Sequence, residues 1–162
     1  MSELDKYWKE DYTNLRGDLI EGVSITSITW HHSDDGSFCE VLTSLWEGEL
    51  QINHSILLPG SIKGAHLHKK QCDRFYCFEP LLVGLKDERE DSSTYGNVMR
   101  FNLCNQRLFI PNGVSHAISN LSTTPRHLFY IVDKWFSLEE HDEWRRDYKE
   151  VFGEDFFNMR KG

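Results

Sequence analysis

The chain has 162 residues and carries 26 acidic against 18 basic side chains, a formal net charge of −8. This charge repels nucleic acids and anionic lipid surfaces, so we expect no nucleic-acid or membrane partner, although a local cluster of cations in a cleft can still bind a small anion. The length suits a single domain over residues 1–162. No apolar run is long enough to span a membrane and no secretion signal is recognisable, which argues against membrane-spanning and secreted classes.

The four cysteines follow no Cys-x-x-Cys spacing, which argues against a zinc or dithiol site built from them. We expect reduced thiols, packed as small apolar side chains, in a cytoplasmic protein. The residues concerned are Cys39, Cys72, Cys77 and Cys104.

The first 21 residues are polar and form a lead-in to the fold. Their sparse apolar anchors, Trp8, Tyr12 and Leu15, are spaced like one face of a short helix. A strand-like segment follows, in which the apolar positions change register after Ile25. This slip predicts a β-bulge near Thr26.

Residues 22–136 consist of short strand-like runs separated by turns rich in Gly, Pro, Asn and Ser. This pattern predicts an all-β antiparallel sandwich or barrel, with no room for alternating β-α units. In the run 50–58, alternation puts Gln51, Asn53 and Ser55 on one face of a strand. We expect these three polar side chains to line a cavity.

The C-terminal part has a different pattern, because Ser137 is followed three residues later by Glu140, as in a capping box. Gly153 is suited to end a helix. The sequence therefore predicts one amphipathic α-helix over residues 137–153, packed on the sheets or on a partner subunit. Its apolar face would carry Trp144, Tyr148, Val151 and Phe152.

Two segments resemble the paired motifs of the cupin family, which implies an all-β cupin jelly roll. The first runs from Gly60 to Asp73 and the second is "PNGVSHAISN". The motifs usually hold a glutamate where Asp73 stands, and they close with glycines where this chain has Pro80 and Asn105. Three imidazoles and a carboxylate suit zinc, iron, manganese or nickel, so a divalent transition metal is one alternative. Its ligands would be His66, His68, Asp73 and His116.

A longer resemblance consists of separate segments that together span residues 34–136, most of the chain. The ungapped stretch "QINHSILLPGSIKGAHLH" (51–68) is similar to the pattern Q-x-N-H-S followed by G-x-x-R-G-L-H of the dTDP-4-dehydrorhamnose 3,5-epimerase family. Three further segments resemble that family in the same order: "DGSFCEV", "DEREDSSTYG" and "FIPNGVSHAI". The shorter "GAHLHKK" also resembles a turn of the dTDP-sugar 3,4-ketoisomerases.

The epimerase resemblance implies a nucleotide-diphosphate sugar as substrate, no cofactor, and a homodimer that exchanges N-terminal strands. It implies His66 as the base that removes a proton next to a ketone, and Tyr130 as the acid on the opposite face of the sugar. Such chemistry needs a base, a second proton donor and a partner for the enolate oxygen. The expected substrate-binding residues are Phe38, Glu40, Gln51, Asn53, Ser55, Lys63, His68, Asp73 and His116, of which Phe38 and Glu40 would reach the neighbouring subunit.

The chain departs from the family where Asp73 replaces a lysine, Asp35 an arginine and Phe136 a tyrosine. An aspartate repels an enolate oxygen unless it is protonated or bound to a metal. Three interpretations therefore stay open: an epimerase or isomerase, a metal-dependent cupin enzyme, and a binding module without catalysis. Candidate phosphate contacts are Lys63, Arg89 and Arg107.

Overall fold

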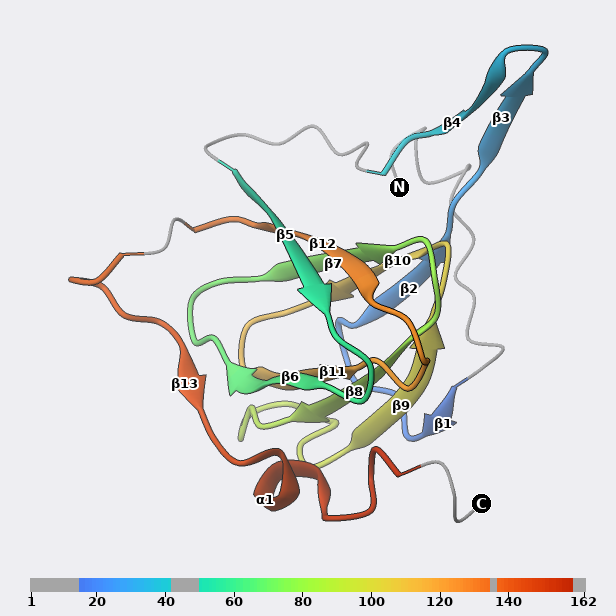
Figure 1. Cartoon of the computed structure of the whole chain (residues 1–162). Helices are drawn as coiled ribbons and strands as arrows, with labels where there is room; N and C mark the ends of the chain where they lie inside the picture. The colour runs from blue at the N-terminus through green and yellow to red at the C-terminus, as the bar shows by residue number, and fades with distance from the viewer. Residues whose placement is uncertain (1–14, 42–49, 135–136, 159–162) are drawn as a thin grey trace.

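The computed structural model describes residues 15–41, 50–134 and 137–158, and Figure 1 shows their arrangement. Two antiparallel sheets form the body, and a hairpin projects from it. The six-stranded sheet has the order β1-β9-β8-β11-β6-β13, and the five-stranded sheet has the order β2-β10-β7-β12-β5. The expected all-β jelly roll with a C-terminal helix is confirmed.

The strands are short and follow one another along the chain, separated by turns. Their bounds are β1 Arg16–Gly17, β2 Ser24–Ser27, β3 Trp30–Ser33, β4 Gly36–Cys39, β5 Gln51–Leu57, β6 Ile62–Leu67, β7 Asp73–Cys77, β8 Leu81–Asp87, β9 Val98–Leu103, β10 Gln106–Ile110, β11 Val114–Ser119, β12 Arg126–Val132 and β13 Trp144–Arg145. The helix α1 covers Tyr148–Phe152. Strands β1 and β13 thus extend the six-stranded sheet beyond residues 22–136.

The main core lies between the two sheets, and alternate side chains along the strands point into it. Inward positions such as Val83 and Leu85 on β8 and Leu108 on β10 are fully buried. The turn between β9 and β10 depends on Asn105, which has a φ of 51°. Asparagine is one of the few residues that adopt this left-handed conformation at low cost, so it serves where the cupin motif has glycine.

The two sheets differ in what covers their outer faces. A second cluster, with Leu82 and Phe157 among its buried members, packs α1 and the segment after it against the six-stranded sheet. The outer face of the five-stranded sheet is open in the described part of the chain: Ile52 is 69% exposed and Ile56 is 50% exposed. Strands β3 and β4 pair with each other and project from the body (Figure 1).

At the N-terminal side one local prediction is wrong, and another lies mostly outside the described residues. The expected bulge near Thr26 is wrong, because β2 ends at Ser27 and the chain leaves the sheet to begin β3 at Trp30. The change of apolar register therefore marks a passage between two strands. Trp8 and Tyr12 of the expected lead-in helix lie outside the described residues, and Leu15 packs against the main core just before β1.

The predicted C-terminal helix ends at Gly153 as expected but begins eleven residues late. Ser137 does accept hydrogen bonds from the backbone N–H groups of Glu139 and Glu140, yet no helix follows. The first helical residue is Tyr148, and Asp147 caps it by accepting from the backbone N–H of Lys149. Residues 138–140 bend instead, Asp142 bonds to residues 68–71 just after β6, and Trp144–Arg145 pair with β6 as β13. No helix in the described part of the chain is long and apolar enough to cross a membrane.

Candidate active site

A cavity of about 980 Å³ opens between the two sheets, at the end where β5, β6, β7, β11 and β12 meet. The polar face of β5 lines it as predicted: Gln51, Asn53 and Ser55 all border the cavity. The Gln51 side chain donates to the Asn53 side chain over 2.7 Å, which fixes the two amides relative to each other. The cavity is therefore bordered by oriented hydrogen-bonding groups, as a polyhydroxylated ligand requires.

Tyr130 borders the same cavity from β12, together with Leu128 and Val132 on the same face of that strand. Its ring contacts Phe75, with the ring centres 6.1 Å apart, and Phe75 in turn contacts His116 at 5.5 Å. These ring contacts thus connect the two sheets at the edge of the cavity. His66 on β6 and Tyr130 on β12 belong to different sheets and border the same cavity.

A β-bulge sets the direction of the His66 side chain. His116 lies opposite His66 in the pairing of β11 with β6, while Ala117 lies opposite Gly64, so Ala65 is the extra residue. Gly64 and Ala65 both have positive φ, 96° and 60°. A Cβ on Gly64 would lie 2.8 Å from the backbone oxygen of His116, so this approach of the strands requires glycine.

Replacing Gly64 with alanine should disturb both stability and activity, because it opposes the positive φ and the contact with β11. We expect a loss of about 1–3 kcal/mol in the free energy of unfolding, together with a lower turnover as His66 moves. Gly60→Ala is the matched control, since Gly60 has a φ of 73° but no atom within 4 Å of an added Cβ. Urea unfolding and activity assays of both variants test this prediction. Equal losses of stability and activity in the two variants would show that the approach of Gly64 to the His116 backbone is unimportant.

His66 is uncharged at neutral pH. Burial, followed by the charges of His116 and His68, lowers the pKa of the His66 imidazole to about 3. One of its ring nitrogens therefore carries a lone pair at neutral pH. The Nδ1 atom lies 3.8 Å from a carboxylate oxygen of Glu143, which is longer than a hydrogen bond.

His68, His116 and Asp73 form a tight group beside His66. The Oδ2 atom of Asp73 lies 3.0 Å from His116 Nε2 and 3.6 Å from His68 Nε2. The Asp73 carboxyl is 3% exposed and also accepts from the Gln71 side chain over 2.6 Å. Although burial alone would raise the pKa of Asp73, the contacts with His116, His68 and Gln71 lower it below the usual range. The residue in place of the family lysine is thus a buried carboxylate held among imidazoles.

The segment 137–147 supplies functional contacts that the sequence does not reveal. The Asp142 carboxylate accepts from the backbone N–H groups of Lys69, Lys70 and Gln71, each over 2.9 Å. Its backbone oxygen lies 2.5 Å from His68 Nδ1. The stretch "EEHDEW" resembles an ordinary helix surface, so no signal in it indicated that Asp142 and Glu143 border the cavity.

Of the remaining predicted site residues, one borders the cavity and the others lie away from it. Lys63 borders the cavity from β6. Phe38 and Glu40 lie on the projecting hairpin, where both contact His31, and they do not border the cavity of their own chain. Arg107 lies on β10 between the buried Gln106 and Leu108, outside the residues that border the cavity.

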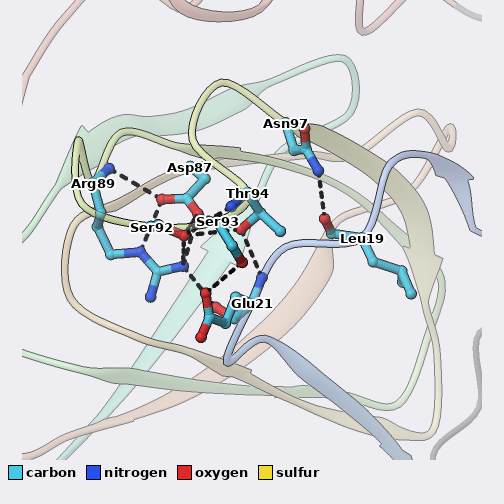
Figure 2. Close-up of polar contacts among 8 residues, drawn as sticks. All are labelled: Leu19, Glu21, Asp87, Arg89, Ser92, Ser93, Thr94 and Asn97. Atoms are coloured by element: carbon cyan, nitrogen blue, oxygen red, sulfur yellow. Dashed lines mark hydrogen bonds and ion pairs between the residues drawn. The ribbon is translucent and has the colours of Figure 1, made fainter.

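Arg89, proposed from the sequence as a phosphate contact, instead bonds to other residues of the protein. Its guanidinium pairs with Asp87 at 2.8 Å and donates to the backbone oxygen of Glu21. Ser92 and Thr94 also donate to Asp87, and Figure 2 shows these groups gathered around one carboxylate. The loop 87–96, which resembles the epimerase family, is therefore bonded to Glu21 of the N-terminal segment and does not border the cavity.

Comparison with known proteins finds relatives that match most of the chain. The chain is 33% identical over 134 residues to the spore coat polysaccharide biosynthesis protein SpsL of Bacillus subtilis, covering 78% of this chain and 89% of the relative. It is 29% identical over 139 residues to the "Probable low-salt glycan biosynthesis epimerase Agl13" of Haloferax volcanii, covering 80% and 88%. No family model matches the chain.

Solved structures share the fold at lower sequence identity. The dTDP-4-dehydrorhamnose 3,5-epimerase of Elizabethkingia anophelis superposes with a TM-score of 0.73 and 22% identity, covering 93% of this chain and 86% of that one. RmlC of Streptococcus suis, solved with dTDP-D-xylose, gives a TM-score of 0.64 and 23% identity over 78% and 73% of the two chains. The chain therefore belongs to the same family as SpsL, and it shares the cupin fold of the dTDP-4-dehydrorhamnose 3,5-epimerases (RmlC).

Proposed function

We propose that the chain is a nucleotide-sugar epimerase or isomerase that moves a proton at a carbon next to a ketone. One observation carries this proposal. The neutral His66 imidazole and the Tyr130 hydroxyl come from facing sheets and border one cavity with a row of polar side chains. A base and a proton donor on opposite sides of a ligand are the minimum for inversion at such a carbon.

The reaction follows from this arrangement in two proton transfers. His66 takes the proton, the C–H electron pair becomes the double bond of an enolate, and the former ketone oxygen carries the negative charge. Tyr130 then donates its proton to the same carbon from the other side, and the electron pair returns to restore the ketone. The amides of Gln51 and Asn53 and the hydroxyl of Ser55 orient the ring. Water returns the proton to Tyr130 and removes it from His66.

The substrate class is proposed from the names of the relatives together with the cavity. Agl13 is described as an epimerase of glycan biosynthesis, and the RmlC structure from Streptococcus suis holds dTDP-D-xylose. We assign to this chain a dTDP-4-keto-6-deoxyhexose or a close analogue. Such substrates are made inside cells, and Cys39, Cys72, Cys77 and Cys104 are all free thiols, so the proposed place of action is the cytoplasm.

Solvent exchange tests the proposed reaction directly. The purified protein is incubated in D₂O with dTDP-4-keto-6-deoxyglucose, and NMR follows deuterium at the carbons next to the ketone. The proposal expects exchange that depends on the protein and saturates with substrate. Saturable binding without exchange would contradict it and favour a binding module that has kept the cavity and lost catalysis.

A homodimer is the second part of the proposal. The five-stranded sheet exposes Ile52 and Ile56 on its outer face, and Phe38 on the projecting hairpin is 62% exposed. Exposed apolar side chains on an open sheet face are typical of a surface that binds another chain. In a dimer the hairpin would bring Phe38 and Glu40 toward the partner's cavity.

Light scattering during gel filtration tests the dimer. The parent protein should have the mass of two chains, whereas the double variant Ile52→Glu and Ile56→Glu should have the mass of one. Leu138→Glu is the matched control, because Leu138 is also exposed but lies after the sheet, on the segment beside the cavity. A parent protein with the mass of one chain at micromolar concentration would rule the proposal out.

A further inference from the structure

The bulged residue Ala65 is held from the side of β6 that faces away from β11. The backbone N–H of Arg146, just after β13, donates to the Ala65 backbone oxygen over 2.8 Å. Ala65 has a φ of 60° and is 2% exposed. A bulge leaves its extra residue unpaired in the ladder, and a residue other than glycine keeps a positive φ only where its surroundings hold it. The bond from Arg146 is therefore one of the contacts that keep the bulge, and with it the direction of His66, the next residue.

The Arg146 side chain is fixed in turn by two groups on other segments. Its guanidinium pairs with Glu88, just after β8, and donates to the Ser115 hydroxyl on β11 over 3.0 Å. The Ser115 hydroxyl donates to the other carboxylate oxygen of Glu88 over 3.1 Å. Ser115 is fully buried, and the Glu88 side chain is 15% exposed. These three residues form a closed ring of charge-assisted hydrogen bonds, the Arg146 network, which holds its members in one geometry.

Two of the three segments joined by the Arg146 network flank His66. On β11, His116 follows Ser115 and lies opposite His66, and on β13, Arg145 precedes Arg146 and also lies opposite His66. Side chains alternate along a strand, so Ser115 points away from the face on which His116 borders the cavity. Within the part of the chain that the structure describes, no member of the Arg146 network borders the cavity. The network therefore lies behind His66, where a ligand in the cavity does not reach it.

We propose that Arg146 is a positioning residue: together with Glu88 and Ser115 it holds the Ala65 bulge, so that the His66 imidazole keeps its direction in the cavity. Arg146 acts through its backbone bond to Ala65 and makes no contact with the ligand. A displacement of about 1 Å, even one caused by a residue far from the chemistry, costs up to about 10²-fold in rate. This inference rests on the proposed function, because it takes His66 as the base.

Solvent exchange at saturating dTDP-4-keto-6-deoxyglucose tests this role. Arg146→Met keeps the backbone N–H and much of the side-chain length but removes the guanidinium, and Glu88→Gln removes its partner charge. We expect both changes to lower the saturated exchange rate by roughly 10- to 100-fold, while the dissociation constant measured by calorimetry stays nearly the same. Arg146→Lys should lie in between, because an ammonium can pair with Glu88 but lacks the fork that also reaches Ser115. Circular dichroism verifies that each variant is folded.

Arg100→Met is the matched control. Arg100 lies on β9, which β8 and β11 separate from β6 in the same sheet, and it donates to the backbone oxygen of Phe156 over 2.8 Å. Its loss should lower stability but leave the exchange rate of the folded protein at the parental value. Parental exchange in Arg146→Met, or an equal loss in Arg100→Met, would overturn the positioning role. A raised dissociation constant with an unchanged saturated rate would also overturn it, because Arg146 would then act on the ligand.

The position of His66 can also be measured without substrate. The ring centres of His66 and His116 lie 4.6 Å apart, so NMR should give a nuclear Overhauser contact between their ring protons in the parent protein and in Arg100→Met. We expect Arg146→Met to weaken this contact, and an unchanged contact would overturn the inference. A parent protein that shows the ring contact but no exchange with substrate would refute the proposed function alone, and the contact in Arg146→Met would still decide the inference.

Discussion

Replacing His66 with asparagine should lower the rate of solvent exchange into a dTDP-4-keto-6-deoxy sugar by about 10²–10⁴-fold, the usual contribution of a positioned general base. The dissociation constant for the nucleotide sugar should change little, because most of the contact comes from the polar face of β5. Asparagine is smaller than histidine and still polar, so the buried site should keep its shape. Exchange is measured by NMR in D₂O and binding by calorimetry.

Tyr130→Phe is the matched partner of this experiment. It removes one hydroxyl and leaves the ring contact with Phe75 in place. If Tyr130 is the acid, this variant should still exchange the proton on the His66 side while inverted product falls sharply. A His66→Asn protein that exchanges at the parental rate would contradict the assignment of the base, and equal loss of exchange in both variants would contradict the division of roles.

Local periodicity was sufficient to predict the polar wall of the cavity. The alternation over residues 50–58 places Gln51, Asn53 and Ser55 on one face whatever the rest of the fold does, because side chains alternate along every strand. The inward face of β12 follows from the same rule and includes Tyr130. These residues could be assigned from sequence because the information lies within one strand.

The surroundings of His66 could not be predicted in this way. Its direction depends on the bulge at Ala65, which exists because Gly64 approaches the backbone of His116 on another strand. The contact of Asp73 with His116 likewise joins β7 of one sheet to β11 of the other. A motif can indicate that such residues are near one another, but not which ring nitrogen meets which oxygen.

The start of the C-terminal helix was also mispredicted because it depends on contacts between distant parts of the chain. Ser137 and Glu140 satisfy the local rule for a helix start, and Ser137 makes the capping contacts. The three backbone N–H groups of residues 69–71 compete for the same segment, because all three donate to the Asp142 carboxylate. This long-range bonding holds Asp142 beside residues 69–71, and a Glu143 carboxylate oxygen then lies 3.8 Å from His66 Nδ1.

Replacing Asp87 with asparagine should cost about 2–4 kcal/mol of the free energy of unfolding, since removing one member of a buried ion pair leaves the other without a counter-charge. The Asp87 carboxylate is fully buried and accepts from the Arg89 side chain, Ser92 and Thr94. An amide can accept at one atom only and would turn N–H groups toward donors. The melting temperature should fall by about 10 °C.

The pH dependence of this loss has a definite sign. Burial alone would raise the pKa of Asp87, but hydrogen bonds from Arg89, Thr94 and Ser92 outweigh it and hold the pKa well below its usual range. A carboxyl with a lowered pKa in the folded state stabilises the fold fully above its unfolded pKa of about 3.9. That stabilisation is lost as the pH falls through the folded pKa, because the unfolded chain binds the proton first.

The difference in stability between parent and Asp87→Asn should therefore be constant between about pH 5 and pH 8 and shrink below about pH 4. Asp91→Asn is the matched control, because it makes the same change at an exposed position of the same loop and should cost less than about 0.5 kcal/mol. Urea unfolding of the three proteins at several pH values measures both effects. A difference that grows toward acid pH would mean that Asp87 is protonated in the native state, and the network in Figure 2 would then be held by a neutral carboxyl.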